Sequence, residues 1–223
     1  MELSRVLYRA EGPVTLIGGG PAPAAALAAA LGLAPEVYAA DGGADLALPA
    51  GHELRAVIGD IDSLADRRAI EARGVPVHRI DEQESTDLEK CLYSVEAPLY
   101  LGVGFLGGQV DHELAALNAL AKHPGEPLIL IGERDICLRV PEAGISLTAE
   151  AGDRVSLFPM GPARGTHSAG LRWPVTDLDL APAGRIGTSN AALGGMLEAR
   201  FTGGPVLLIL PARYLGEVAR RMA

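Results

Sequence analysis

Short apolar segments alternate with helical stretches over the first 131 residues, and this alternation constrains the fold more than any other feature of the sequence. The apolar segments, each as long as a typical buried strand, are Val14–Gly18, Glu36–Ala40, Arg55–Ile58, Val75–Arg79, Leu99–Gly102 and Leu128–Ile131. The helical stretches between them are Ala22–Leu31, about Ala44–Leu48, Leu64–Arg73, Thr86–Val95 and Asp111–Lys122. Strands and helices that alternate in this way form β-α-β units. The sequence therefore predicts a mostly parallel open sheet with helices on both faces.

The pattern changes after Ile131, where short strand candidates follow one another with almost no helical periodicity. Gly, Pro or Asp residues separate these candidates, which are Ile136–Val140, Gly144–Thr148, Arg154–Phe158, Thr166–Ala169, Asp177–Leu180, Gly184–Gly187, Met196–Phe201 and Val206–Leu210. Strands at this spacing are typical of an antiparallel sandwich or barrel. A last helix is predicted over Tyr214–Met222. We therefore predict an α/β domain over residues 1–132 and a β domain over residues 133–223.

The composition excludes several classes of protein. Hydrophobic residues make up 48% of the chain, so it can bury a core and is not expected to be disordered. The formal net charge of −9 argues against nucleic acid or an anionic membrane as a partner. Cys91 and Cys137 lack metal-ligand spacing and are expected to be buried thiols. The Ala-rich segment over residues 22–34 has no basic segment before it and is too short to span a bilayer. We therefore predict a cytoplasmic protein.

The turn Gly59-Asp60-Ile61-Asp62-Ser63 follows directly after one of the predicted strands. Ligands of open parallel sheets collect outside the carboxyl ends of the strands. Two carboxylates at such a position can bind a hard divalent cation through their oxygens. The alternative is that Asp60 caps the next helix and that Asp62 and Ser63 are ordinary turn residues.

Four further turns of the first domain are rich in glycine or acidic residues, namely Gly18–Pro21, Asp41–Asp45, Asp81–Lys90 and Gly107–His112. Glycines between a strand and a helix let a phosphate approach the backbone, although a plain tight turn explains Gly18–Pro21 equally well. Glu82 and Glu84 are expected to form an exposed acidic loop, and Lys90 an ordinary solvated position. Because several acidic turns follow successive strands, we predict that they converge on one metal-nucleotide site. Asp60, Asp62 and Asp87 could place Mg²⁺ against phosphate oxygens there.

These turns resemble the motifs of thiamin pyrophosphokinase. The matching segments are D-G-G-A-D at 41–45, G-D-I-D-S at 59–63, S-T-D-L-E-K at 85–90 and G-G-Q-V-D-H at 107–112. The second half agrees as well, at Val155–Pro159, Gly170–Pro174 and Thr188–Asn190. Order and spacing agree over nearly the whole chain, so the ordered set is more specific than any one motif.

The resemblance implies an α/β nucleotide domain followed by an antiparallel β-sandwich, in a homodimer whose site is shared between subunits. It implies transfer of the pyrophosphoryl group of ATP to thiamin, which gives thiamin diphosphate and AMP. It also implies that Mg²⁺ binds to Asp60, Asp62 and Asp87, and it adds Asp111 to the catalytic residues. The residues assigned to the nucleotide are Gly19, Gly20, Gly42, Gly43, Gln83, Thr86, Lys90, Gly107, Gly108 and Gln109.

For thiamin, the resemblance assigns Asp41, Ser189, Asn190 and Trp173. Asp41 would lie between nucleotide and thiamin. Ser189 and Asn190 are expected in a Gly-flanked loop between strands, where they could instead only stabilise a turn. Trp173 could offer an aromatic surface to the ligand or belong to the core of the sandwich.

Two positions depart from the family pattern. Asp45 stands where the family often has Asn, and Gln109 stands where it commonly has Arg. The second change removes a plausible phosphate contact, for which Lys90 or an arginine could compensate.

Two other functions are compatible with the motifs. A Mg²⁺-dependent phosphohydrolase could use Asp60 as nucleophile, but it usually has Thr two residues after the second Asp, where this chain has Leu64. A thiamin- or nucleotide-binding protein with weak or no catalysis is the other alternative, because of Gln109.

Overall fold

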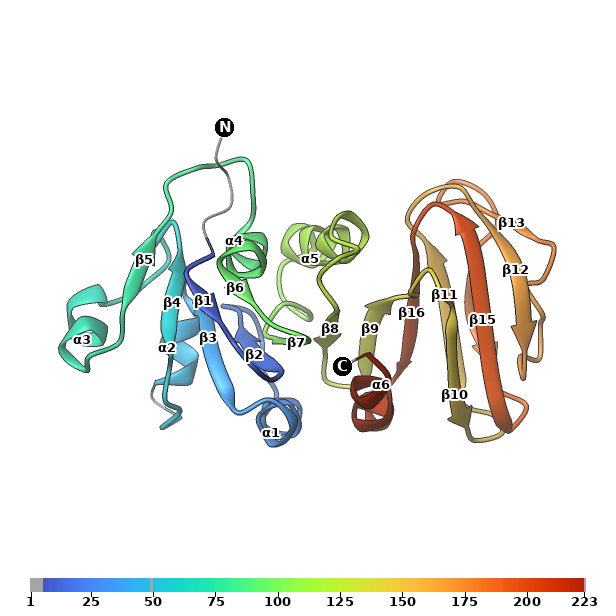
Figure 1. Ribbon diagram of the computed structural model, residues 1–223, viewed down its shortest axis with the longest axis horizontal. Coiled ribbons are helices and arrows are strands. Elements are labelled where there is room, and N and C mark those ends of the chain that lie inside the picture. The colour runs from blue at the N-terminus through green and yellow to red at the C-terminus, as the bar shows by residue number, and fades with distance from the viewer. Residues whose placement is uncertain (1–5, 49, 223) are drawn as a thin grey trace. The chain divides into compact units, whose positions relative to one another are not determined.

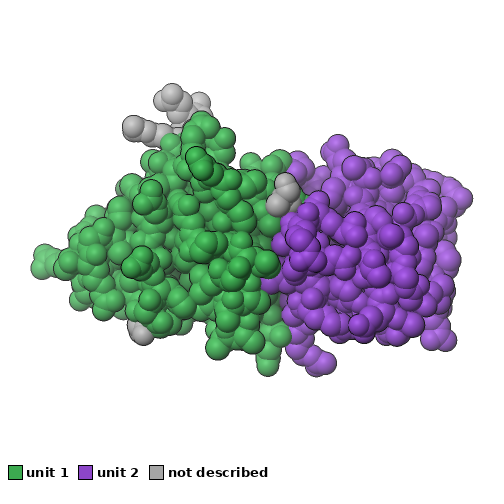
Figure 2. All heavy atoms as spheres, turned by 60° about the horizontal axis from the view of Figure 1, so that its bottom comes forward, with its two compact units in different colours: residues 1–119, 125–133, 222–223 green, residues 120–124, 134–221 purple. Residues whose placement is uncertain are grey.

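The computed structural model describes residues 6–48 and 50–222. Contacts divide the chain into two compact units, coloured separately in Figure 2. The second unit comprises Leu120–Pro124 and Arg134–Arg221, and the other described residues form the first. No helix among the described residues is long and apolar enough to cross a membrane.

The first unit is built on a parallel sheet, as predicted. In spatial order its strands are β8 (Leu128–Ile131), β7 (Tyr100–Val103), β2 (Val14–Ile17), β3 (Glu36–Ala40), β4 (Ala56–Gly59) and β5 (Val77–Arg79). Each neighbouring pair is parallel. The four-residue strands β2, β4, β7 and β8 are buried along their whole length, which explains why they read as continuous apolar runs.

Helices cover both faces of this sheet (Figure 1). They are α1 (Ala24–Leu33), α2 (Gly43–Ala47), α3 (Arg67–Ala72), α4 (Asp87–Ser94) and α5 (Val110–Lys122). The helix α1 packs against β7, whereas α4 packs on the opposite face against β3 and β4. All carboxyl ends of the strands point to one edge of the sheet, and the acidic turns begin there.

Two short strands were not predicted. β1 (Tyr8–Arg9) and β6 (Val95–Glu96) pair in parallel, with Tyr8 opposite Val95. The helix predicted over Thr86–Val95 therefore ends one residue early, at Ser94. Two residues are too few to show an alternating pattern, so the sequence could not reveal this pair.

The second unit is a sandwich of two antiparallel sheets. One has the order β14 (Gly187–Ala191), β11 (Arg154–Pro159), β16 (Val206–Pro211) and β9 (Asp135–Arg139). The other has the order β10 (Ile145–Ala149), β15 (Gly195–Gly203), β12 (Ala163–Ala169) and β13 (Asp179–Leu180). Leu157 and Leu208 of the first sheet and Leu147 and Leu197 of the second belong to the buried core. The chain ends in a 3-10 turn, Ala212–Tyr214, and the helix α6 (Leu215–Met222).

One predicted strand of the second unit was wrong. The segment Gly184–Gly187 was assigned as a strand, but Gly184 closes a turn by donating its amide hydrogen to the Ala181 carbonyl. The strand β14 begins only at Gly187 and includes Ser189 and Asn190. These two residues therefore lie on a strand and not in the loop that we expected.

Candidate functional site

Three carboxylates gather at the edge of the parallel sheet. Asp41 follows β3, Asp60 follows β4, and Asp87 is the first residue of α4. Each offers one oxygen, and these oxygens all lie within 4.8 Å of one another. The strands β3 and β4 are parallel neighbours and α4 packs against both, so the topology itself brings the three residues together.

Asp41 is the most buried member of this cluster, with 3% of its surface exposed. Its Oδ2 accepts the amide hydrogen of Ser63 at 3.0 Å, whereas its buried Oδ1 has no hydrogen-bond partner among the described residues. Burial raises the pKa of Asp41, and the nearby charges of Asp87 and Asp60 add to this. A buried oxygen without a partner is rare in native structures, and a bound cation is one arrangement that would satisfy it.

Asp60 and Asp87 are linked by hydrogen bonds and by a shared cation. The amide of Asp60 donates to Asp87 Oδ1 at 3.2 Å, and Gln83 Nε2 donates to Asp60 Oδ2 at 3.1 Å. Lys90 Nζ lies 3.2 Å from Asp87 Oδ1 and 3.6 Å from Asp60 Oδ2. Burial tends to raise the pKa of Asp60, but the Gln83 hydrogen bond and the Lys90 charge outweigh it, and the pKa is lowered.

The expectation that Lys90 is a solvated helix residue was wrong. Only 1% of its surface is exposed. Burial alone would lower the pKa of the ammonium group, but the carboxylates of Asp87 and Asp60 outweigh it, and the pKa is raised. The spacing of Asp87 and Lys90 showed that they share a helix face, but not that this face is covered.

Asp62 stands apart from the cluster. Its side chain is exposed and accepts a hydrogen bond from Ser63 Oγ at 2.9 Å. Ile61 has a left-handed backbone with φ 66°, which turns the chain between the two aspartates. The structure therefore brings together the carboxylates of Asp41, Asp60 and Asp87, and Asp62 is not a member of this cluster. The assignment of Asp62 as a metal ligand stays a prediction.

The first two acidic turns are tied to each other by hydrogen bonds from backbone amides of the second turn to side-chain carboxylates of the first. Asp41 accepts the amide hydrogen of Ser63, and Asp45 accepts that of Ala65 at 2.9 Å. Asp45 is one of the two departures from the family pattern, and the structure gives it a local role. An asparagine oxygen could accept the same hydrogen bond, so the change from Asn preserves this link.

Side-chain hydrogen bonds hold the segment before α4 in place. Glu82 was expected in an exposed loop, but it is partly buried and accepts hydrogen bonds from Ser85, from the Glu84 amide and from Tyr93 Oη. Thr86, assigned to the nucleotide, caps α4 by accepting from the Glu89 amide at 3.3 Å, and Glu89 completes a capping box. These bonds hold the residues on both sides of Gln83 and the start of α4, where Asp87 lies.

One glycine-rich turn follows Asp41 directly, and two others lie next to each other. Gly20 donates its amide hydrogen to the Gly104 carbonyl at 2.9 Å, and a Cβ on Gly108 would lie 3.9 Å from the Cα of Gly20. The predicted segments around Gly20 and Gly108 are thus neighbours. Gly42 and Gly43 lead into α2, where a Cβ on Gly43 would overlap the Ile17 carbonyl oxygen.

The remaining predicted residues of this unit are at its surface. Gly19, Gly107 and Gln109 are exposed, and so is Asp111 in the first turn of α5. Asp111 Oδ1 accepts the amide hydrogen of His112 at 3.0 Å. Asp111 does not cap α5, because that helix already begins at Val110.

In the second unit, Trp173 and Asn190 are directly bonded. Trp173 is 54% exposed, so it is not part of the core of the sandwich. Asn190 is 4% exposed, and its amide binds both backbone groups of Trp173, at 3.1 Å to the nitrogen and 2.6 Å to the oxygen. Ser189 is exposed, has φ 58°, and donates its amide hydrogen to Ser156 Oγ at 3.0 Å.

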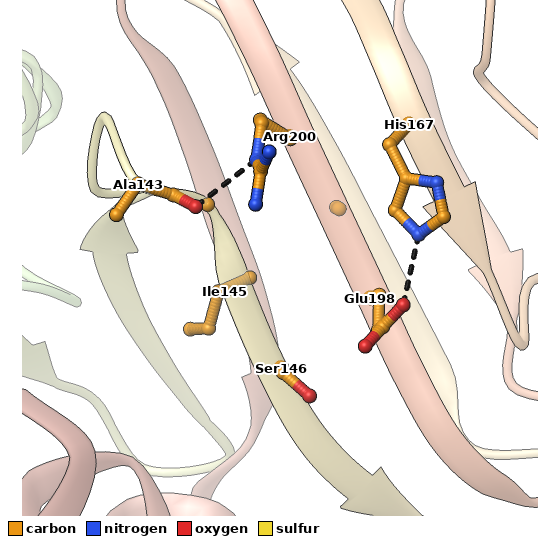
Figure 3. A pocket seen from close by; sticks show the side chains of 8 residues that line it. Ala143, Ile145, Ser146, His167, Glu198 and Arg200 are labelled. Atoms are coloured by element: carbon orange, nitrogen blue, oxygen red, sulfur yellow. Dashed lines mark hydrogen bonds and ion pairs between the residues drawn. The ribbon is translucent and has the colours of Figure 1, made fainter.

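A shallow hollow of about 320 Å³ lies on the sheet formed by β10, β15 and β12 (Figure 3). His167 and Glu198 meet there at 2.8 Å, and Arg200 Nε donates to the Ala143 carbonyl at 3.1 Å. None of the predicted site residues lines this hollow, and its polar side chains already have partners within the same unit, with Ser146 Oγ donating to Met196 Sδ at 2.9 Å.

Comparisons with known proteins agree with the motifs. The family model described as "Thiamin pyrophosphokinase, catalytic domain" matches residues 30–130, and that described as "Thiamin pyrophosphokinase, vitamin B1 binding domain" matches residues 143–202. Thiamine pyrophosphokinase 1 of Oryza sativa subsp. japonica is 31% identical over 59% of this chain and 56% of its own length. Thiamine pyrophosphokinase 1 of Arabidopsis thaliana is 32% identical over 49% of this chain and 46% of its own length. The chain thus spans about half the length of these curated relatives.

Solved structures show the same fold. Thiamin pyrophosphokinase from Candida albicans has a TM-score of 0.76 at 16% identity, covering 90% of this chain and 89% of that chain. Thiamine pyrophosphokinase from Bacillus subtilis has a TM-score of 0.73 at 20% identity, covering 89% of this chain and 98% of that chain.

Proposed function

Because the chain belongs to the thiamin pyrophosphokinase family, we propose that it transfers the pyrophosphoryl group of ATP to thiamin. In this reaction the hydroxyl oxygen of thiamin attacks the β-phosphorus of ATP, and the bond from that phosphorus to the oxygen of AMP breaks. The products are thiamin diphosphate and AMP. The observation that carries the proposal is the cluster of Asp41, Asp60 and Asp87 at the carboxyl edge of a parallel sheet.

The cluster suits Mg²⁺, because carboxylate oxygens are ligands of hard divalent cations and Asp41 Oδ1 has no hydrogen-bond partner in the described part of the chain. Asp41, Asp60 and Asp87 would hold the ion, and Asp62 is the additional ligand predicted from the sequence. When bound, Mg²⁺ would neutralise phosphate charge that this acidic protein would otherwise repel. Gln83 orients Asp60 through its hydrogen bond.

Backbone amides of the glycine-rich turns around Gly20 and Gly108 are proposed to bind the phosphates, apart from those of Gly20 and Gly107, which donate to the Gly104 carbonyl and to Glu113. Gln109 can contribute a hydrogen bond there but no charge. The exposed ring of Trp173 is proposed to support thiamin, on a backbone that Asn190 holds in place. We also propose a homodimer with a shared site, as the resemblance implies, and a cytoplasmic location.

The product assay tests the reaction. Incubation of the full chain with ATP, Mg²⁺ and thiamin should give thiamin diphosphate and AMP in equal amounts, measured by chromatography. Formation of ADP with thiamin monophosphate would contradict pyrophosphoryl transfer. Release of phosphate through a covalent aspartyl-phosphate would instead support the phosphohydrolase, and thiamin binding without AMP would support a binding protein.

Two substitutions separate the roles of neighbouring residues on β14. Ser189→Ala should weaken thiamin binding about threefold to tenfold and leave ATP binding and melting temperature unchanged, because it removes one exposed hydroxyl. Asn190→Ala should lower the melting temperature, because the backbone groups of Trp173 lose their partner at a cost of about 1–3 kcal/mol. Calorimetric titration and thermal unfolding measure the two effects. Equal loss of both ligands in Ser189→Ala would assign a structural role to this residue as well.

Dimers that combine two different variants test whether the site is shared between subunits. Asp87→Asn and Trp173→Ala chains should each be weakly active, and a dimer of one chain of each kind should regain one intact site. Activity that does not rise on mixing and refolding, or an active monomer in sedimentation, would overturn the shared site.

A further inference from the structure

Among the described residues around the cluster of Asp41, Asp60 and Asp87, Lys90 is the one side chain that pairs with these carboxylates as a cation. It lies one turn after Asp87 on α4 and is 1% exposed. Its Nζ contacts Asp87 at 3.2 Å and Asp60 at 3.6 Å. A buried ammonium group is costly unless it is paired, so these contacts account for its position.

Lys90 and a divalent metal ion together would balance the charge of the three carboxylates. The oxygens of Asp41, Asp60 and Asp87 lie within 4.8 Å of one another, where carboxylates repel. One lysine against three carboxylates leaves two negative charges, which is the charge that a divalent cation neutralises. The lysine thus reduces the repulsion between carboxylates in the protein without metal, but it does not remove the attraction for the ion.

We propose that Lys90 is a positioning residue that holds Asp60 and Asp87 together before the metal binds, and that it does not contact the nucleotide. The proposal rests on the Mg²⁺ site of the proposed function. The contrasting role, a phosphate contact, requires an accessible ammonium group, whereas both partners of this one are carboxylates and its side chain is 2% exposed.

The experiment compares Lys90→Met with the wild type in thermal unfolding, with EDTA and with Mg²⁺ alone. Without metal, the variant should melt roughly 5–10 °C lower, because it leaves the carboxylates without their counter-cation. Mg²⁺ should raise the melting temperature of the variant by more degrees than it raises that of the wild type. In calorimetric titration, Mg²⁺ should bind roughly tenfold more tightly to the variant, because a positive charge that repels the ion is gone.

Two variants serve as controls. Lys90→Arg keeps the charge. Mg²⁺ should therefore raise the melting temperature of this variant by as much as it raises that of the wild type, even if the larger side chain lowers the melting temperature without metal. Lys122→Met removes the chain's only other lysine and should leave the Mg²⁺ affinity unchanged.

Two results would overturn the proposal. If Lys90→Met melts lower by the same amount with and without Mg²⁺, Lys90 only fills space. If its melting temperature without metal is unchanged but ATP binds more weakly, Lys90 contacts the nucleotide. Failure of the wild type to make thiamin diphosphate would refute the proposed function alone, because the metal-free comparison does not depend on turnover.

Discussion

Replacing Asp87 with asparagine is expected to reduce thiamin diphosphate formation by roughly 100-fold or more while the protein stays folded. The substitution removes one anionic oxygen from the cluster. Asparagine keeps one acceptor oxygen, so the hydrogen bond from the Asp60 amide can persist and the start of α4 should be preserved. Initial rates over a range of Mg²⁺ concentrations measure the loss, and circular dichroism checks the fold.

Asp81→Asn is the matched control, because Asp81 belongs to the same acidic segment but pairs with Arg79 at the surface. It should retain near wild-type activity. Asp60→Asn should behave like Asp87→Asn, and Asp62→Asn decides whether the exposed aspartate contributes. Near wild-type activity of Asp87→Asn at low Mg²⁺ would show that this residue is not a ligand.

Gly59→Ala is expected to reduce the proposed pyrophosphoryl transfer as strongly as the loss of a carboxylate. An added Cβ would lie 2.9 Å from Asp41 Cβ, 3.0 Å from Asp87 Oδ1 and 3.2 Å from the Asp41 amide nitrogen. Gly59 is buried at the end of β4, so neither the strand nor the turn can easily move away. A shift of the carboxylates by several tenths of an ångström should lower activity by roughly 100-fold, and the melting temperature should also fall.

Gly32→Ala is the control for Gly59→Ala, because it makes the same change of residue at a position where the added Cβ has no close neighbour. A Cβ at Gly32, in the last turn of α1, would meet nothing within 4 Å. This variant should be fully active and could gain about 0.5–1 kcal/mol of stability, because alanine favours the helix. If Gly59→Ala binds Mg²⁺ and turns over like Gly32→Ala, the close packing around Gly59 is not required for the site.

The sequence predicted those parts of the structure that repeat. Strand and helix alternation gave the parallel sheet, and the turn after each strand gave the edge where Asp60 and Asp87 meet. It could not predict that Ile61 turns Asp62 away, because a left-handed φ at an isoleucine leaves no signal in composition. It also missed the burial of Lys90, since spacing along a helix shows which residues share a face but not what covers that face.

The hydrogen bonds from Ser63 to Asp41 and from Ala65 to Asp45 have a consequence for how ligands bind. The turn after β4 is fastened to the turn after β3 at two points, so neither can rearrange alone. A loop that is already ordered loses little conformational freedom when a ligand arrives, and more of the contact energy appears as affinity. Rigidity at these two turns therefore contributes to binding even though Asp45, Ser63 and Ala65 need not touch the ligand themselves.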